Sequence, residues 1–212
     1  MDRPRLGASL AVGGDLEGAQ AQLTLASTSP QRRAILERLG IAFVAVAPEY
    51  EEIGDDPVEH AAGKARSVDG PLVLGVDTDV FVDSRRLGKA ASAAEAAAML
   101  TDLAGRAHEV VSGLCLRTPA WEELHRVVTE VSFRQLGAGE IDRYVATGEW
   151  EGRAGAYAIQ GAGAALVERI EGDYLNVVGL PTLLLAGLLV ERFPGRYGKS
   201  LLAAAARLET PS

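Results

Sequence analysis

The stretch from Leu72 to Val82 places the tightest constraint on the fold. Its first five residues, through Val76, are apolar or glycine and suit a strand that is buried on both faces. Asp77 and Asp79 then interrupt the apolar pattern. If the strand lay at the edge of a sheet, these two acids would simply be solvated. Because the preceding residues look buried on both faces, we instead expect an internal strand in which Asp77 has a function.

Segments with strand and helix signals alternate along the rest of the chain. This alternation predicts an α/β fold with one mixed, twisted sheet flanked by helices. We expect residues 23–212 to form a single domain and residues 1–22 to be a disordered N-terminal extension. The other predicted strands are 23–26, 41–47, 109–117, 124–134 and 165–170, and the predicted helices are 30–39, 57–68, 93–103, 140–146, 180–191 and 198–208.

Composition narrows the classes of function. The 212 residues carry a formal net charge of −8, which argues against a general binder of nucleic acid or membrane surfaces. The single Cys115 excludes an intrachain disulfide and a cysteine zinc site. His60, His108 and His125 are dispersed without a metal-binding spacing, so we expect none of them to bind metal. No apolar stretch is long enough to span a membrane, and a cytoplasmic protein is expected.

The segment from Ser27 to Arg33 is typical of an anion-binding loop. It follows a predicted strand and opens a helix, so free backbone N–H groups and the helix dipole converge there. Arg32 and Arg33 lie in the first turn, where positive charge opposes the dipole, and this placement makes sense if an anion binds between them. The alternative is a solvated basic pair on an ordinary helix capped by Ser29.

A second segment, from Glu149 to Gly161, also indicates nucleotide binding. Its glycines would let the backbone approach a ligand closely, and Arg153 among them suits a phosphate. A buried Gln160 would suit the edge of a nucleobase, because an amide both donates and accepts hydrogen bonds.

Acidic residues suggest a cation site. A buried carboxylate such as that of Asp77 is costly unless it is paired or bound to a cation. Glu49, Glu51 and Glu52 cluster after the second predicted strand and, with Asp77, could bind a hard divalent cation through oxygen. On its own, such a cluster is more often a solvated loop.

The order of these pieces resembles the Maf family, the septum-formation-associated nucleoside triphosphate pyrophosphatases. The resemblance runs from Leu23 to about Phe193. The matching segments, in chain order, are Leu25-Ala26-Ser27 with Ser29-Pro30-Gln31-Arg32-Arg33, Glu51-Glu52, Lys64-Ala65, Asp77-Thr78, Gly88-Lys89, His108-Glu109-Val110, Gly148-Glu149, Ala154-Gly155-Ala156-Tyr157 with Ile159-Gln160-Gly161, and Gly172-Asp173-Tyr174 with Asn176-Val177-Val178-Gly179-Leu180-Pro181.

The resemblance implies two lobes around a deep central cleft and, often, a homodimer. It also implies hydrolysis of a nucleoside triphosphate to the monophosphate and pyrophosphate with a divalent metal cation (Mg, Mn or Co). Asp77 would be the general base, and Glu52 would hold the metal with Asp77. The residues that would bind the substrate are Ser29, Arg32, Arg33, Lys64, Thr78, Lys89, Arg153 and Gln160.

The segment from Ala154 to Gly161 resembles family members that act on dTTP and UTP, whereas those that prefer 7-methyl-GTP tend to carry a different residue at the position of Gln160. This chain departs from the family pattern at Gln31, commonly arginine, and at Gly152-Arg153, usually Asp-Lys. Two alternatives stay open: a non-catalytic nucleotide-binding regulator of cell division, and a pyrophosphatase for 7-methyl-GTP or purine nucleotides.

Overall fold

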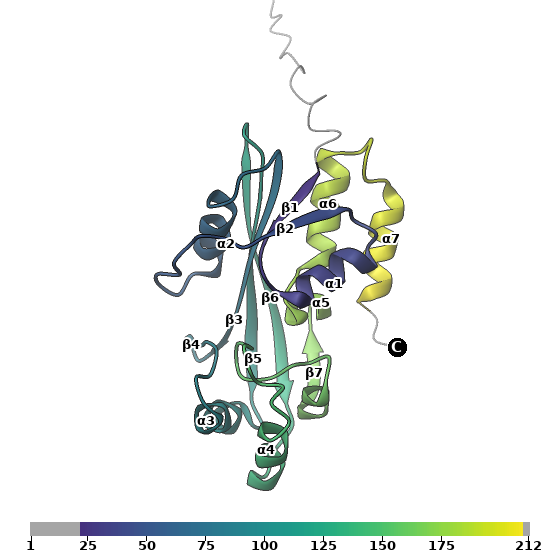
Figure 1. The fold of residues 1–212 in the computed structure, drawn as a ribbon. Helices are drawn as coiled ribbons and strands as arrows, with labels where there is room; N and C mark the ends of the chain where they lie inside the picture. The colour runs from purple at the N-terminus through teal and green to yellow at the C-terminus, as the bar shows by residue number, and fades with distance from the viewer. Residues whose placement is uncertain (1–21, 210–212) are drawn as a thin grey trace, which may run out of the picture.

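The computed structural model describes residues 22–209, so the predicted N-terminal extension lies, apart from residue 22, outside the described residues. Within this range the chain forms a mixed seven-stranded sheet with helices around it, which confirms the predicted fold class (Figure 1). The strands are β1 (Leu23–Ala26), β2 (Phe43–Val46), β3 (Leu72–Val82), β4 (Arg85–Leu87), β5 (Ala107–Arg117), β6 (Glu122–Phe133) and β7 (Val167–Glu171). The helices are α1 (Pro30–Arg38), α2 (Pro57–Arg66), α3 (Ala93–Leu103), α4 (Ala138–Val145), the 3-10 helix η2 (Ala162–Leu166), α5 (Tyr174–Val178), α6 (Thr182–Arg192) and α7 (Lys199–Leu208).

Long central strands connect two hydrophobic cores. At one end of β3, Leu72, Leu74 and Val76 pack with residues of α1, α6 and α7. At the other end, Val80 and Val82 pack with residues of α3 and α4, which lie at the opposite end of the molecule (Figure 1). The segment 77–79 of β3 belongs to neither core. The polar break in the sequence pattern therefore marks the boundary between the two lobes.

The sheet leaves one edge of β3 open at this boundary. Strand β5 pairs along the other edge of β3, antiparallel, from Val73 to Phe81. On the open edge, β1 runs parallel to β3 only as far as Gly75, and β4 begins to pair at Val80. Within the described range, no strand pairs with residues 76–79 on this edge. A ligand can therefore approach β3 edge-on at Asp77.

Helices α1, α6 and α7 cover one face of the sheet, and helix α2 packs very closely on the other face (Figure 1). Two glycines make this possible. A Cβ on Gly75 would stand 2.1 Å from the backbone oxygen of Ala61, and one on Gly113 would stand 2.0 Å from that of Pro57. Any side chain at these positions would push α2 away, so the glycines fix how near the side chains of α2 come to β3.

Most predicted elements are confirmed, with shifts at their ends. Strand β3 and helix α3 have the predicted bounds. The predicted strand 165–170 was placed too early, because η2 occupies its first residues and β7 begins only at Val167. Strand β4 and helix α5 were missed, since three and five residues are too short to show a periodic pattern. No helix in residues 22–209 is long and apolar enough to cross a membrane.

Candidate active site

Two adjoining cavities open between the lobes, with volumes of about 460 and 400 Å³. Their shared lining comes from the α1 N-terminus, the loop after β2, α2, and the segments around residues 89 and 152. The second cavity also reaches the open edge of β3. The residues that line both cavities are Ser29, Gln31, Arg32, Glu52, Lys64, Lys89, Gly152 and Arg153.

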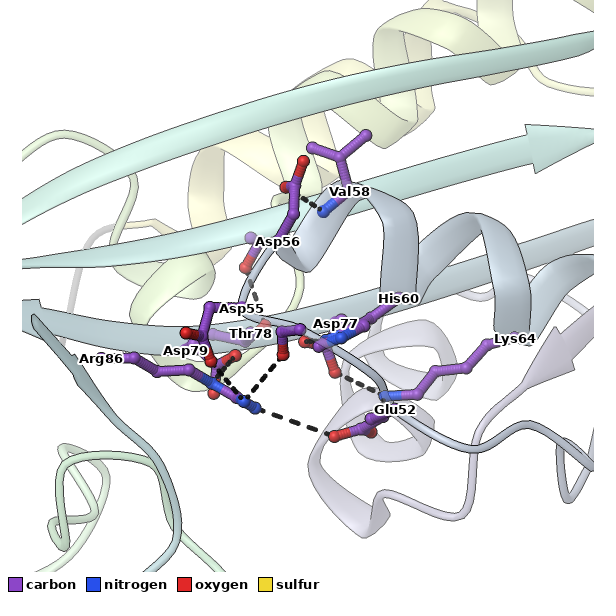
Figure 2. Close-up of polar contacts among 12 residues, drawn as sticks. Glu52, Asp55, Asp56, Val58, His60, Lys64, Asp77, Thr78, Asp79 and Arg86 are labelled. Carbon is purple, nitrogen blue, oxygen red and sulfur yellow. Dashed lines mark hydrogen bonds and ion pairs between the residues drawn. The ribbon is translucent and has the colours of Figure 1, made fainter. Parts of the chain in front are cut away.

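Asp77 forms part of the wall of the second cavity and is held from α2. Its residue surface is only 6% exposed. Lys64 donates to its Oδ1 over 2.5 Å, and Nδ1 of His60 lies 3.3 Å from its Oδ2. Figure 2 shows both α2 side chains directed at the strand, as expected for residues four apart on one helical face. Burial alone would raise the pKa of Asp77, but Lys64, Arg32 and His60 outweigh it and hold that pKa below its ordinary value.

Lys64 joins Asp77 to a second carboxylate. Its Nζ also lies 2.5 Å from Oε1 of Glu52, which comes from the loop after β2 (Figure 2). Burial raises the pKa of Glu52, but the hydrogen bond and the positive charge of Lys64 have the larger combined effect. The pKa of Glu52 therefore lies below its ordinary value. The loop packs on α2 through Tyr50, whose ring occupies the space where a Cβ of Gly63 would stand. Both carboxylates are thus ionised at neutral pH and share one ammonium.

Arg86 and Asp79 form an ion pair at the edge of this site. Arg86, on β4, donates from Nε to Oδ2 of Asp79 over 2.7 Å, and its Nη1 lies 3.2 Å from Oδ1 of Asp55 (Figure 2). Burial and the charge of Asp77 raise the pKa of Asp79, while Arg86 lowers it, and the net shift is upward. We did not predict Arg86, because the strand that carries it has only three residues.

Arg32 extends from the α1 N-terminus across the boundary between the lobes. Its guanidinium donates to the backbone oxygen of Gly179 (2.9 Å), to Ser27 Oγ (3.1 Å) and to Thr78 Oγ1 (3.3 Å). Burial lowers the pKa of Arg32, and the nearby carboxylates partly offset this effect. A guanidinium has five N–H groups, so two remain for a ligand once the three bonds to described residues are made. Thr78 is therefore a partner of Arg32 as well as a wall of the cavity.

Two other residues that were predicted to bind the substrate, Ser29 and Lys89, line both cavities. Ser29 caps α1, with its Oγ accepting from the backbone N–H of Arg32 over 3.4 Å. The exposed Lys89 follows β4 and pairs by an isolated backbone bridge with Ala154. This bridge brings the segment around residue 153 alongside the end of β4.

Arg153 contacts both cavities and a third, smaller recess that also contains Gln160. Its buried Nε has no hydrogen-bond partner among the described residues. Gln160 is exposed rather than buried, although it lies in the recess. The structure does not bring Arg33 to the cleft: its side chain is exposed on α1.

Three side chains could hold a metal ion together. Glu52, His60 and Asp77 each offer a donor atom, and the three atoms lie within 4.8 Å of one another. Two carboxylates and an imidazole form a donor set that suits divalent metals. The expectation that no histidine binds metal rested on sequence spacing, and spacing could not show that α2 sets His60 against Asp77.

Comparison with known proteins agrees with the family resemblance. Residues 22–192 match the family model described as Maf-like protein. The chain is 47% identical to a dTTP/UTP pyrophosphatase from Symbiobacterium thermophilum, over 76% of this chain and 88% of that protein. It is 46% identical to one from Anaeromyxobacter dehalogenans (79% and 92%) and 42% identical to one from Dictyoglomus thermophilum (85% and 98%). The chain therefore belongs to the Maf family.

Proposed function

We propose that this protein hydrolyses nucleoside triphosphates, principally dTTP and UTP, to the monophosphate and pyrophosphate. The observation that carries the proposal is Asp77, a buried carboxylate kept ionised by Lys64 beside a cleft that several cations line. Relatives that are 42–47% identical over most of their length carry the name dTTP/UTP pyrophosphatase.

The cations suit a triphosphate. Arg32, Lys89 and Arg153 line the cavities from three separate segments, so their charges surround the space that a polyanion would fill. Among residues 22–209, Nε of Arg153 and two N–H groups of Arg32 have no hydrogen-bond partner, so they are available as donors to a ligand. Ser29 would add a hydroxyl at the helix N-terminus, where anions are favoured. These groups would bind the triphosphate and stabilise the departing pyrophosphate.

Asp77 would accept a proton from the attacking water. Attack forms a new phosphorus–oxygen bond and breaks the anhydride bond between the α- and β-phosphates, so pyrophosphate leaves. A divalent metal held by Glu52 and Asp77 would supply positive charge against the phosphates and would make water more acidic, which suits a base whose pKa is low. Lys64 keeps both carboxylates ionised and near each other.

Gln160 is our candidate for reading the base. Its recess also contains Gln31, Arg153 and Tyr157, so the recess adjoins the phosphate cavity through Arg153. An amide complements the donor–acceptor edge that thymine and uracil share. Because Gln160 is exposed, it would become enclosed only when a base binds against it.

The decisive experiment measures pyrophosphate release from dTTP, UTP, CTP, ATP, GTP and 7-methyl-GTP with Mg²⁺, Mn²⁺ or Co²⁺ present. We expect dTTP and UTP to give the highest kcat/KM. A preference for a purine nucleotide would contradict the assigned substrate. Binding of dTTP without turnover under every metal would instead favour a regulator. Assembly as a homodimer and a cytoplasmic location stay predictions, which light scattering and cell fractionation can test.

A further inference from the structure

His60 has two ring nitrogens that both face oxygen acceptors. Nδ1 lies 3.3 Å from Oδ2 of Asp77, and Nε2 lies 3.3 Å from the backbone oxygen of Ile53. The residue is fully buried, so the ring cannot turn to water for other partners. A backbone carbonyl only accepts hydrogen bonds, and Nε2 must therefore carry a proton to satisfy it.

If the His60 ring is neutral, this arrangement leaves Nδ1 facing Asp77 without a proton to donate. A neutral imidazole carries one proton, so the lone pair of Nδ1 would face the lone pairs of an ionised carboxylate. Either a second proton or a metal cation between Nδ1 and Asp77 removes this conflict. Lys64 already binds Oδ1 of Asp77, whereas Oδ2 faces His60 and is the oxygen that a cation could share with Nδ1.

We propose that His60 is a nitrogen ligand of the catalytic metal, which it holds together with Asp77 and Glu52. This proposal rests on the proposed function, because it concerns the metal of the same site. The 3.3 Å separation between Nδ1 and Oδ2 fits two donors of one ion. With metal–ligand bonds of about 2.0–2.2 Å, that separation corresponds to an angle of about 105° at the metal, within the range of ordinary coordination.

The nitrogen donor has a consequence for the metal that the enzyme prefers. Sites made only of oxygen suit Mg²⁺, whereas imidazole favours later transition metals such as Co²⁺. The Nε2–H bond to Ile53 also fixes the orientation of the ring, as outer partners of metal-bound histidines do. We therefore expect this enzyme to bind Co²⁺ more tightly than Mg²⁺, with His60 responsible for most of the difference.

The test uses the full chain without a histidine tag and without nucleotide. Pulsed EPR of the Mn²⁺-loaded protein should show coupling to a directly bound nitrogen, and His60→Gln should lose it. Calorimetric titration should give a Co²⁺ affinity that falls by about 10–100-fold or more in His60→Gln, with a much smaller change for Mg²⁺. His125→Gln is the matched control, because His125 lies on β6 and is not among the grouped metal donors, and it should leave both readouts unchanged.

Bound Mn²⁺ without nitrogen coupling in the wild-type protein would overturn the proposal, as would coupling that persists in His60→Gln. The wild-type spectrum alone decides the question if His60→Gln does not fold. Pyrophosphate release measured on the same samples separates a failure of the proposed metal ligand from a failure of the proposed function. Turnover without nitrogen coupling refutes only the ligand role of His60, whereas coupling without turnover refutes only the proposed function.

Discussion

Replacing Gly75 with alanine tests whether the sheet sets the position of α2 and, through it, the active site. The added Cβ would stand 2.1 Å from the backbone oxygen of Ala61 and 2.8 Å from Cβ of Ala65. An ordinary contact needs about 3.4 Å, so α2 must retreat by more than about 1 Å, at a cost of about 1–3 kcal/mol in unfolding free energy. For a chain of this size, that cost lowers Tm by about 2–12 °C.

The same displacement of α2 should also slow pyrophosphate release. Lys64 and His60 are carried by α2, and Lys64 now lies 2.5 Å from Asp77. A misplacement of about 1 Å can reduce the rate about 100-fold. Thermal unfolding and pyrophosphate release from dTTP measure the two effects. Gly187→Ala is the control, because a Cβ there meets nothing within 4 Å and alanine favours the helix. A Gly75→Ala protein with wild-type Tm and activity would refute the close packing of α2 on β3.

Three further predictions concern separate parts of the molecule. Arg32→Ala should raise the KM for dTTP more than about 10-fold in steady-state kinetics, as expected for loss of a charge-assisted contact worth about 1.5–3 kcal/mol, whereas Arg33→Ala, at an exposed position, should change it little. Burial lowers the pKa of His108 from 6.5 to about 4. The stability it contributes is therefore complete above pH 6.5 and is lost as the pH falls to about 4, by on the order of 3 kcal/mol; urea unfolding should show this loss in the wild type and a smaller loss in His108→Phe. Gln160→Leu should lower kcat/KM for dTTP and, in competition assays, should reduce the ratio of kcat/KM for dTTP to kcat/KM for GTP. If this ratio stays at the wild-type value, Gln160 does not recognise the base.

The sheet and its central acid were predictable because their signals are local. A run of apolar residues that a single pair of acids interrupts is visible in the sequence, and β3 has the predicted bounds. The cap at Ser29 and the helix that follows were visible for the same reason. Such signals depend on neighbours within a few residues, which is why the fold class was confirmed.

The partners of the acid were harder to predict because they depend on how helices pack. His60 and Lys64 are four residues apart, and this spacing could have indicated one helical face. Which face meets Asp77 depends on Gly75 and Gly113, whose lack of side chains lets α2 approach the sheet. No pattern within α2 itself contains that information.

The two adjacent arginines, Arg32 and Arg33, show a second limit on predicting the site from sequence. In a helix, successive side chains point about 100° apart, so only one of a neighbouring pair can face a given site. Arg32 turns inward to Gly179 and Thr78, and Arg33 is exposed. Gln160 shows a related limit, since the sequence indicated its chemistry but not its exposure.

The central claim is that Asp77 takes the proton from the water that attacks the nucleotide. Single-turnover release of pyrophosphate from dTTP tests it most directly, in the wild type and in Asp77→Asn, with Asp102→Asn as a carboxylate control on α3. We expect Asp77→Asn to bind dTTP and remain folded by circular dichroism, yet to release pyrophosphate about 10²–10⁴-fold more slowly, while Asp102→Asn matches the wild type. Release at nearly the wild-type rate from folded Asp77→Asn would contradict the account.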